Sequence, residues 1–282
     1  MISDYRCFFC LTTAFGNLLE KEDITGKEKS RFALDMINLY GNNWEKMTAP
    51  EFSRELHIIL KGYTHNPDPY RNAKKESNDL AMGILPELKT LISSSADPFG
   101  TALRIAVAGN IMDFATNDKF NLEETVRETL DSELAIDNSV RLKEALTKAQ
   151  SVLYLGDNAG EIVFDRLFLE TLGHPNLVYV VRGSPVINDA TIEDAHYTGM
   201  DETADVITNG YDAPSTIIDK CSPQFRDLFA GADLIISKGQ GNLEGLVTLN
   251  DKRIFFLLMA KCSVIAEFLN VKKGSLVVYN PC

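Results

Sequence analysis

Residues 151–165 read SVLYLGDNAGEIVFD, an apolar run that leads through a polar turn into a second apolar segment. The first run has the length and composition of a buried strand, whereas the segment after the turn fits the start of a helix. Gly156 and Gly160 flank Asp157 and Asn158 at the join. A turn that binds phosphate by itself usually offers glycine amides and a lysine. This one begins with negative charge, so its chemistry needs another explanation.

The second half of the chain repeats this strand-like pattern. Short apolar runs alternate with segments that are compatible with helices, which favours a mainly parallel sheet covered by helices and therefore an α/β fold. The further runs are LVYVV (177–181), DVIT (205–208), DLIIS (233–237), IFFLL (254–258) and SLVVY (275–279).

The first half has the pattern of helices. Apolar residues recur at helical spacing over 5–21, Thr48 and Glu51 stand in capping-box register, and a helix crossed by a proline is predicted over 69–94. The run TALRIAVAGNIMDFAT, from residue 101, is apolar almost all round and should lie inside the protein. No strand is expected before residue 150. We predict a helical domain over 1–148 and a second domain over 149–282, with the change between residues 130 and 150.

Composition limits the function. The 282 residues are 45% hydrophobic and 24% charged, with a net charge of −12, so nucleic acid and anionic membranes are not expected partners. No apolar run approaches the roughly 18 residues that span a bilayer, and the first residues lack a basic leader pattern. Five scattered cysteines favour reduced thiols over a disulfide framework. A cytoplasmic protein is expected.

Polar residues follow four of the predicted strands, where ligands of parallel sheets bind. Asp157, Asn158 and Asp189 supply oxygen ligands of the kind that Mg²⁺ or Mn²⁺ prefers. The alternative is that Asp157 and Asn158 cap the next helix. The other polar residues at these strand ends are Arg182, Asn209 and Lys238.

Lys238 begins the segment KGQGNLEG, which fits a strand end, a glycine loop and a helix start, and such a lysine suits phosphate. It could also be a solvated turn lysine. Gly239, Gly241 and Gly245 have G-x-G-x-x-x-G spacing, one residue longer than the usual nucleotide fingerprint, so a dinucleotide or S-adenosylmethionine site stays open. No P-loop motif of the Walker type is present.

Two further pairs are unusual. Asn110 and Asp113 share a helical face at the end of an apolar run, either toward the site or as a structural pair. Cys7 and Cys10 form C-x-x-C, which lacks the further paired ligands of a zinc motif, so core thiols are expected. With Cys262 they could instead form a three-thiol metal site.

The motifs GDNAGEIVFD, INDATIED and ISKGQGNLEG, in this order and after AGNIMDF, resemble the metal-dependent damage-control phosphatases, long called domain of unknown function 89. The shorter microbial branch also has an N-terminal C-x-x-C. The resemblance implies a Rossmann-like α/β/α sandwich preceded by a helical N-terminal domain. It implies metal ligands at Asp157, Asn158 and Asp189. Some relatives have tyrosine and arginine where this chain has Leu243 and Glu244.

The resulting hypothesis is a phosphatase that uses Mn²⁺, Co²⁺, Ni²⁺ or Mg²⁺ on small phosphorylated metabolites. The metal would bind phosphate oxygens and a nucleophilic water. An S-adenosylmethionine-dependent carboxyl methyltransferase and a non-catalytic metal or nucleotide sensor are the alternatives, and no oligomeric state is predicted. Catalytic roles are predicted for Asp157, Asp189 and Lys238, and substrate binding for Lys238, Gly239, Asn242, Asn110, Asp113, Asn209 and Glu161.

Overall fold

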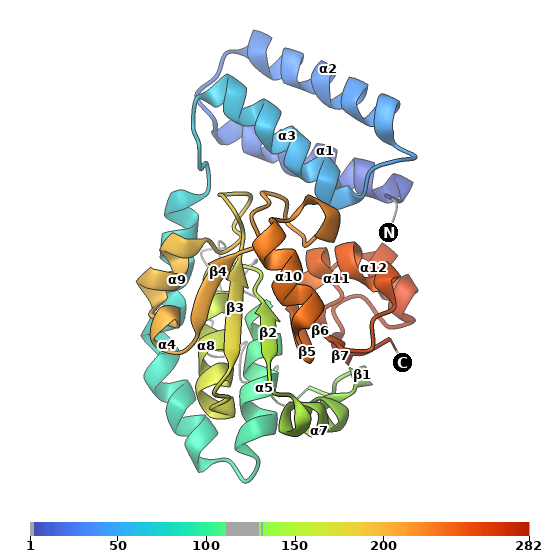
Figure 1. Ribbon diagram of the computed structural model, residues 1–282. Helices are drawn as coiled ribbons and strands as arrows, with labels where there is room; N and C mark the ends of the chain where they lie inside the picture. Colours follow the sequence, from blue (N-terminus) through green and yellow to red (C-terminus); the bar gives the residue numbers. More distant parts are fainter. Residues whose placement is uncertain (1–2, 111–129, 131, 282) are drawn as a thin grey trace.

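A computed structural model of the protein describes residues 3–110, 130 and 132–281 and shows an α/β fold (Figure 1). Three N-terminal helices stand apart from the sheet and share their own core, in which Phe15, Phe32 and Leu60 are buried. The capping box of the third helix is present, with the Thr48 and Glu51 side chains each accepting from the other's backbone N–H. The three helices are α1 (Tyr5–Lys21), α2 (Gly26–Asn43) and α3 (Ala49–Thr64).

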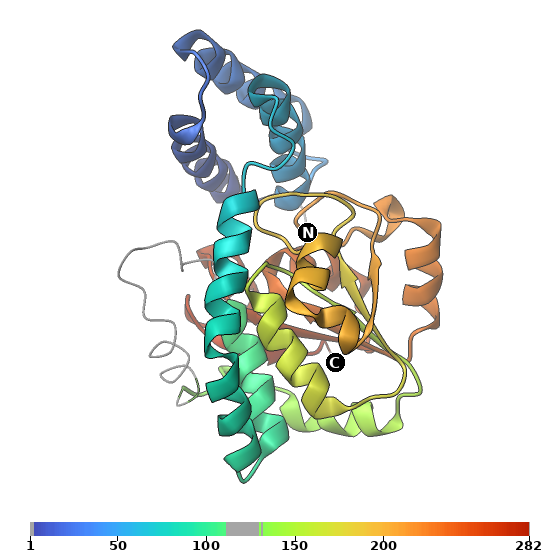
Figure 2. The ribbon, with the colours of Figure 1, turned by 90° about the vertical axis from the view of Figure 1, so that its left-hand side faces the viewer.

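The next two helices pack on the sheet instead. α4 (Arg71–Ser94) contains Pro86 within its length. α5 (Pro98–Ala108) is buried from Ala102 onward except at Arg104, which fits the expectation that its apolar run lies inside the protein. Both helices contribute to one core with α8 (Glu161–Leu172) and the strands. Figure 2 shows the arrangement of these helices from the side of α4. The predicted domain boundary at residue 148 stays a prediction.

The sheet in the described part of the chain has seven strands in the order β1-β7-β6-β5-β2-β3-β4. Neighbouring strands are parallel except β6 and β7, which pair antiparallel. All six strands predicted from the sequence are confirmed within one residue at each end: β2 (Val152–Leu155), β3 (Leu177–Val181), β4 (Asp205–Thr208), β5 (Leu234–Lys238), β6 (Ile254–Met259) and β7 (Leu276–Tyr279).

One expectation was wrong. A strand precedes residue 150, because β1 (Ile136–Asp137) pairs parallel to β7. Two residues are too few to show an apolar period, and the strand is held by backbone bonds from Ala135 N–H to Leu276 O and from Asn138 N–H to Val278 O, both 2.9 Å.

Helices cover both faces of the sheet and produce three layers. The remaining helices are α7 (Ser139–Lys148), α9 (Ile192–Thr198), α10 (Pro223–Gly231), α11 (Gly239–Leu246) and α12 (Ser263–Leu269). Alternate residues of β2 point to opposite sides, Val152 and Tyr154 toward the core with α4, α5 and α8, and Leu153 and Leu155 toward α10, α11 and α12. The parallel strands thus bury both faces, and the α/β/α sandwich is confirmed. No described helix is long and apolar enough to cross a membrane.

Candidate functional site

The site begins at the turn between β2 and α8. Gly160 has a φ of +76°, a conformation that favours glycine, and it precedes the first residue of α8. The backbone of the turn pairs with the segment after β3, through Ala159 N–H to Asn188 O and Ala190 N–H to Asp157 O, each 2.8 Å. This pairing brings two strand ends together and places Asp157, Asn158 and Asp189 side by side.

Two amides orient the Asp157 carboxylate. The Nδ2 groups of Asn110 and Asn158 donate to Asp157 Oδ2 at 3.2 and 2.8 Å, and both also donate to Glu161 Oε2 at 3.1 Å. The amide nitrogen of Asn158 is thus turned toward its neighbours, which directs its Oδ1 away from them. The other half of the predicted helical pair, Asp113, lies outside the described residues.

Arg182 holds the other carboxylate. Its Nε donates to Asp189 Oδ2 at 2.5 Å, and its Nη2 lies 3.5 Å from Asp157 Oδ1. Nη1 donates to Asn242 Oδ1 at 3.0 Å and to the Thr216 hydroxyl at 3.3 Å, and the side chain is buried. The sequence placed Arg182 at a strand end but assigned it no role.

Lys238 lies beneath this layer. Its Nζ contacts Asp165, lies 2.7 Å from Glu161 Oε1 and donates to Ala106 O at 2.8 Å, and the residue has no exposed surface. Burial raises the pKa of Asp165 to about 6, although Lys238 opposes the shift. These contacts favour a role in holding the two carboxylates, and direct contact between Lys238 and phosphate stays a prediction.

The donors fit a divalent cation. Four buried carboxylates, on Asp157, Glu161, Asp165 and Asp189, surround the buried cations of Arg182 and Lys238. Burial raises the pKa of Asp157 well above its usual range, and the charges of Glu161 and Asp189 raise it further. A hard divalent cation would balance the excess charge. Among the described residues, no three histidine, cysteine, aspartate or glutamate side chains form a metal-binding group; the predicted set instead combines two carboxylates with an amide.

The glycine loop predicted after β5 is absent, because α11 begins at Gly239 directly after the strand. Gly239 has a φ of +79°, and a side chain there would collide with the Asp157 carboxylate. Asn242 donates to Gly156 O at 3.1 Å and to Lys238 O at 2.8 Å, so it joins the two strand ends from within. Asn209 accepts from Tyr211 N–H at 2.9 Å. Substrate contacts of Gly239, Asn242 and Asn209 stay predictions.

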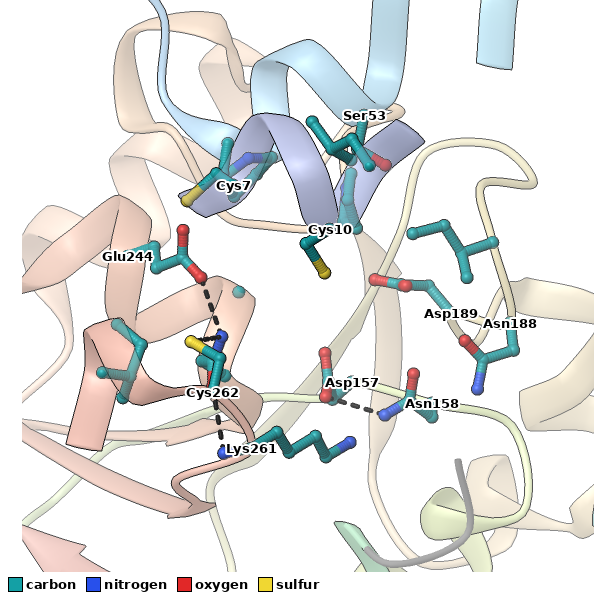
Figure 3. A pocket seen from close by; sticks show the side chains of 18 of the residues that line it. Cys7, Cys10, Ser53, Asp157, Asn158, Asn188, Asp189, Glu244, Lys261 and Cys262 are labelled. Carbon is teal, nitrogen blue, oxygen red and sulfur yellow. Dashed lines mark hydrogen bonds between the residues drawn. The ribbon is translucent and has the colours of Figure 1, made fainter. Parts of the chain in front are cut away.

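A pocket of about 750 Å³ opens above the carboxylates, between them and the N-terminal helices (Figure 3). Asp157, Asn158 and Asp189 line it, together with Lys261, whose charge lowers the pKa of Asp157. Lys261 follows β6 in the stretch MAKCS, so the rule that ligands bind at strand ends could have found it.

The opposite end of the pocket is lined by thiols. Cys7, Cys10 and Cys262 face the same space as Glu244 (Figure 3). The core position expected for Cys7 and Cys10 was wrong: Cys10 is exposed and Cys7 half-buried, because α1 packs through residues such as Phe15 nearer its other end. Burial raises the pKa of Cys7 and Cys10, and nearby Cys262 and Glu244 raise it further.

Fold and site together define an α/β protein with a carboxylate-rich site at the carboxyl ends of its strands. Residues 3–277 match the model of the damage-control phosphatase ARMT1-like domain. The chain therefore belongs to this family of metal-dependent phosphatases, as the motif resemblance predicted, and is an enzyme of the phosphatase class.

Archaeal proteins are similar over most of their length. A damage-control phosphatase of Pyrococcus horikoshii is 32% identical, with 97% of this chain and 96% of the relative covered. One of Archaeoglobus fulgidus is 39% identical over 74% and 75% of the two chains. An uncharacterised protein of Methanocaldococcus jannaschii is 38% identical over 91% and 88%. The crystal structure of a Pyrococcus horikoshii protein of the domain-of-unknown-function-89 family superposes with a TM-score of 0.92 at 30% identity, covering all of both chains.

Proposed function

We propose that the protein hydrolyses phosphate monoesters of small metabolites, such as sugar phosphates and nucleotide or cofactor-related phosphates, with Mn²⁺, Co²⁺, Ni²⁺ or Mg²⁺. The observation that carries this proposal is the excess of buried carboxylate charge at the base of the pocket. A protein with a net charge of −12 needs local positive charge to bind an anionic ester, and a bound cation provides it.

Asp157, Asn158 and Asp189 would hold the metal. A divalent ion bound there supplies Lewis acidity toward phosphate oxygens and an acidified water. The protein fixes the ligands beforehand: Asn110 orients Asp157, and Arg182 holds Asp189. Such fixed outer contacts determine ligand geometry and metal affinity.

The phosphate would lie between the metal ligands and Lys261. Lys261 lines the pocket beside Asp157, and Gln240 and Gly241, at the start of α11, line it too. A lysine charge with helix N-terminal amides suits the remaining phosphate oxygens. Lys238 would act from below, by keeping Glu161 and the rest of the carboxylate layer in place.

The test is turnover of p-nitrophenyl phosphate and a sugar-phosphate panel by purified protein with each of the four metals. Asp157→Ala should lower the rate by several powers of ten, because it removes a charged metal ligand. Asp227→Ala removes an exposed carboxylate on α10 and should leave the rate unchanged. Full activity of Asp157→Ala, or no turnover with any metal, would refute the proposal. Metal binding without turnover would support the alternative of a non-catalytic sensor. Binding of S-adenosylmethionine in calorimetry would support the alternative of a methyltransferase.

A further inference from the structure

Four potential ligands of a different kind lie at the far end of the pocket. We call Cys7, Cys10, Cys262 and Glu244 the thiol cluster; they come from α1, the start of α12 and α11 (Figure 3). Gln240 joins two of them, because its Nε2 donates to Glu244 Oε1 at 3.1 Å and to Cys262 Sγ at 3.4 Å. The cluster uses none of the carboxylates assigned to phosphate hydrolysis.

We propose that the thiol cluster is a second cation site, and that it binds a thiolate-preferring divalent ion of the Zn²⁺ class. Three sulfurs and one carboxylate oxygen match the tetrahedral ligand sets of zinc. The oxygen ligands around Asp157 favour hard cations, so the two ends of one pocket select different metals. The ligand chemistry therefore separates this site from the catalytic one.

Packing does not account for Cys7 and Cys10, whereas Cys262 is partly buried against the apolar core that contains Cys221. Cys10 is exposed, and Cys7 and Cys262 are half-buried around an open pocket. Cys221 is the contrasting case, because it is buried in the apolar core under α10 and donates to Ile217 O. A cysteine retained for its volume is expected in an apolar core, whereas a cysteine that binds a ligand is expected at an open pocket.

Closing the cluster requires the four side chains to move together. Among the described residues, no group of side chains is already placed to hold a metal ion. A change of χ1 rotamer would move the sulfur atom of each cysteine to a new position. On binding, the three S–H bonds ionise, their protons pass to solvent and the thiolate sulfurs bond to the ion. Lys261 and Lys273 also line the pocket and offset the remaining negative charge.

The bound ion would link the N-terminal helices to the sheet. At present Arg6 of α1 reaches α12 through an exposed ion pair with Glu267, with nitrogen–oxygen distances of 2.6 and 2.9 Å, and a bond to Ser263. Exposed pairs contribute little to stability. An ion bound by Cys7, Cys10 and Cys262 together would hold α1 against the start of α12 much more firmly.

Cobalt substitution tests the proposal. Tag-free, reduced protein is titrated with Co²⁺, since thiolate ligands give an intense charge-transfer absorption that oxygen ligands do not. We expect this absorption in the wild type, in Asp157→Asn and in the matched control Cys221→Ser, and its loss in Cys262→Ser. Competition with Zn²⁺ should then show an affinity loss in Cys262→Ser greater than the roughly 10- to 100-fold typical of outer contacts.

Several outcomes would overturn the proposal. They are an absence of thiolate absorption in the wild type, an undiminished absorption in Cys262→Ser, or a loss in Cys221→Ser that equals the loss in Cys262→Ser. Circular dichroism confirms that each variant is folded. If Cys262→Ser does not fold, Cys10→Ser makes the same test, because the Cys10 side chain is exposed.

Discussion

Replacement of Lys238 by methionine separates a supporting role from direct phosphate binding. Lys238 Nζ lies between two buried carboxylates, Glu161 and Asp165, and also donates to Ala106 O. Methionine keeps most of the side-chain volume and removes the charge. Breaking a buried ion pair from one side costs about 3–5 kcal/mol, and here two carboxylates lose the same partner. We expect the urea midpoint to fall by about 1 M or more.

The loss should depend on pH. The folded-state pKa of Asp165, about 6, lies above the ordinary value of 3.8, so protonation of this group favours the folded state. Without Lys238 the carboxyl should protonate more readily still. As the pH falls below about 6, the charge stranded in Lys238→Met is neutralised, and the stability gap from the wild type should narrow.

Lys261→Met is the matched control, since Lys261 lines the pocket rather than the layer beneath it. Urea unfolding at pH 8 and pH 5, with KM and kcat for p-nitrophenyl phosphate, distinguishes the two lysines. Lys261→Met should raise KM with little change in the urea midpoint. The reasoning would be refuted if Lys238→Met unfolded at the wild-type urea concentration and only its KM rose.

Four further substitutions, one of them a control, test the site and the helices around it. Gly239→Ala should lower turnover, and it should lower the free energy of unfolding by about 1–3 kcal/mol because the backbone is strained there. The control Gly83→Ala in α4 has space for its methyl group, so thermal unfolding should show a stabilisation of about 0.4–1 kcal/mol. Asn78→Ala removes the oxygen that accepts from Gly160 N–H at 2.6 Å and so holds the turn that carries Asp157 and Asn158. Metal titration should show a roughly 10- to 100-fold weaker affinity. An unchanged affinity would show that Asn78 does not position the proposed metal ligands. Burial lowers the pKa of His57 to about 4, so the unfolded state binds more protons between pH 6.5 and 4 and stability falls as the pH drops through that range. His57→Phe should abolish about 3 kcal/mol of this dependence in urea unfolding, and an identical pH profile would contradict the assignment.

The proximity of Asp157, Asn158 and Asp189 could be predicted because it follows from topology. Parallel strands expose their carboxyl ends at one edge, so Asp157, Asn158 and Asp189 had to lie near one another once their strands were recognised. Their proposed use as ligands remains to be tested. The strand at residues 136–137 could not be predicted, because two residues in a charged segment are too few to show the alternation of apolar and polar residues that marks a strand.

The direction of the Lys238 side chain depends on whether β5 ends at residue 237 or at residue 238. The apolar run ends at Ser237, which would place Lys238 in a loop at the mouth of the site. β5 instead continues by one residue, and Lys238 pairs with Leu257. Since side chains alternate along a strand, Lys238 shares the face of Ile236, which packs toward α5 and α8. Sequence periodicity does not fix a strand end to one residue, so the direction of this lysine could not be predicted.

Arg182 and Lys238, the buried cations within the site, divide its carboxylates into two layers. Lys238 compensates the lower pair, Glu161 and Asp165, whereas Arg182 contacts Asp189 at 2.5 Å and reaches Asp157 only at 3.5 Å. Both carboxylates line the pocket, and the one with the weaker ion pair, Asp157, lies between two amides that fix its direction. Lys238→Met removes a positive charge from beneath this site, so metal titration of the folded variant should show tighter binding of a divalent cation although the protein is less stable.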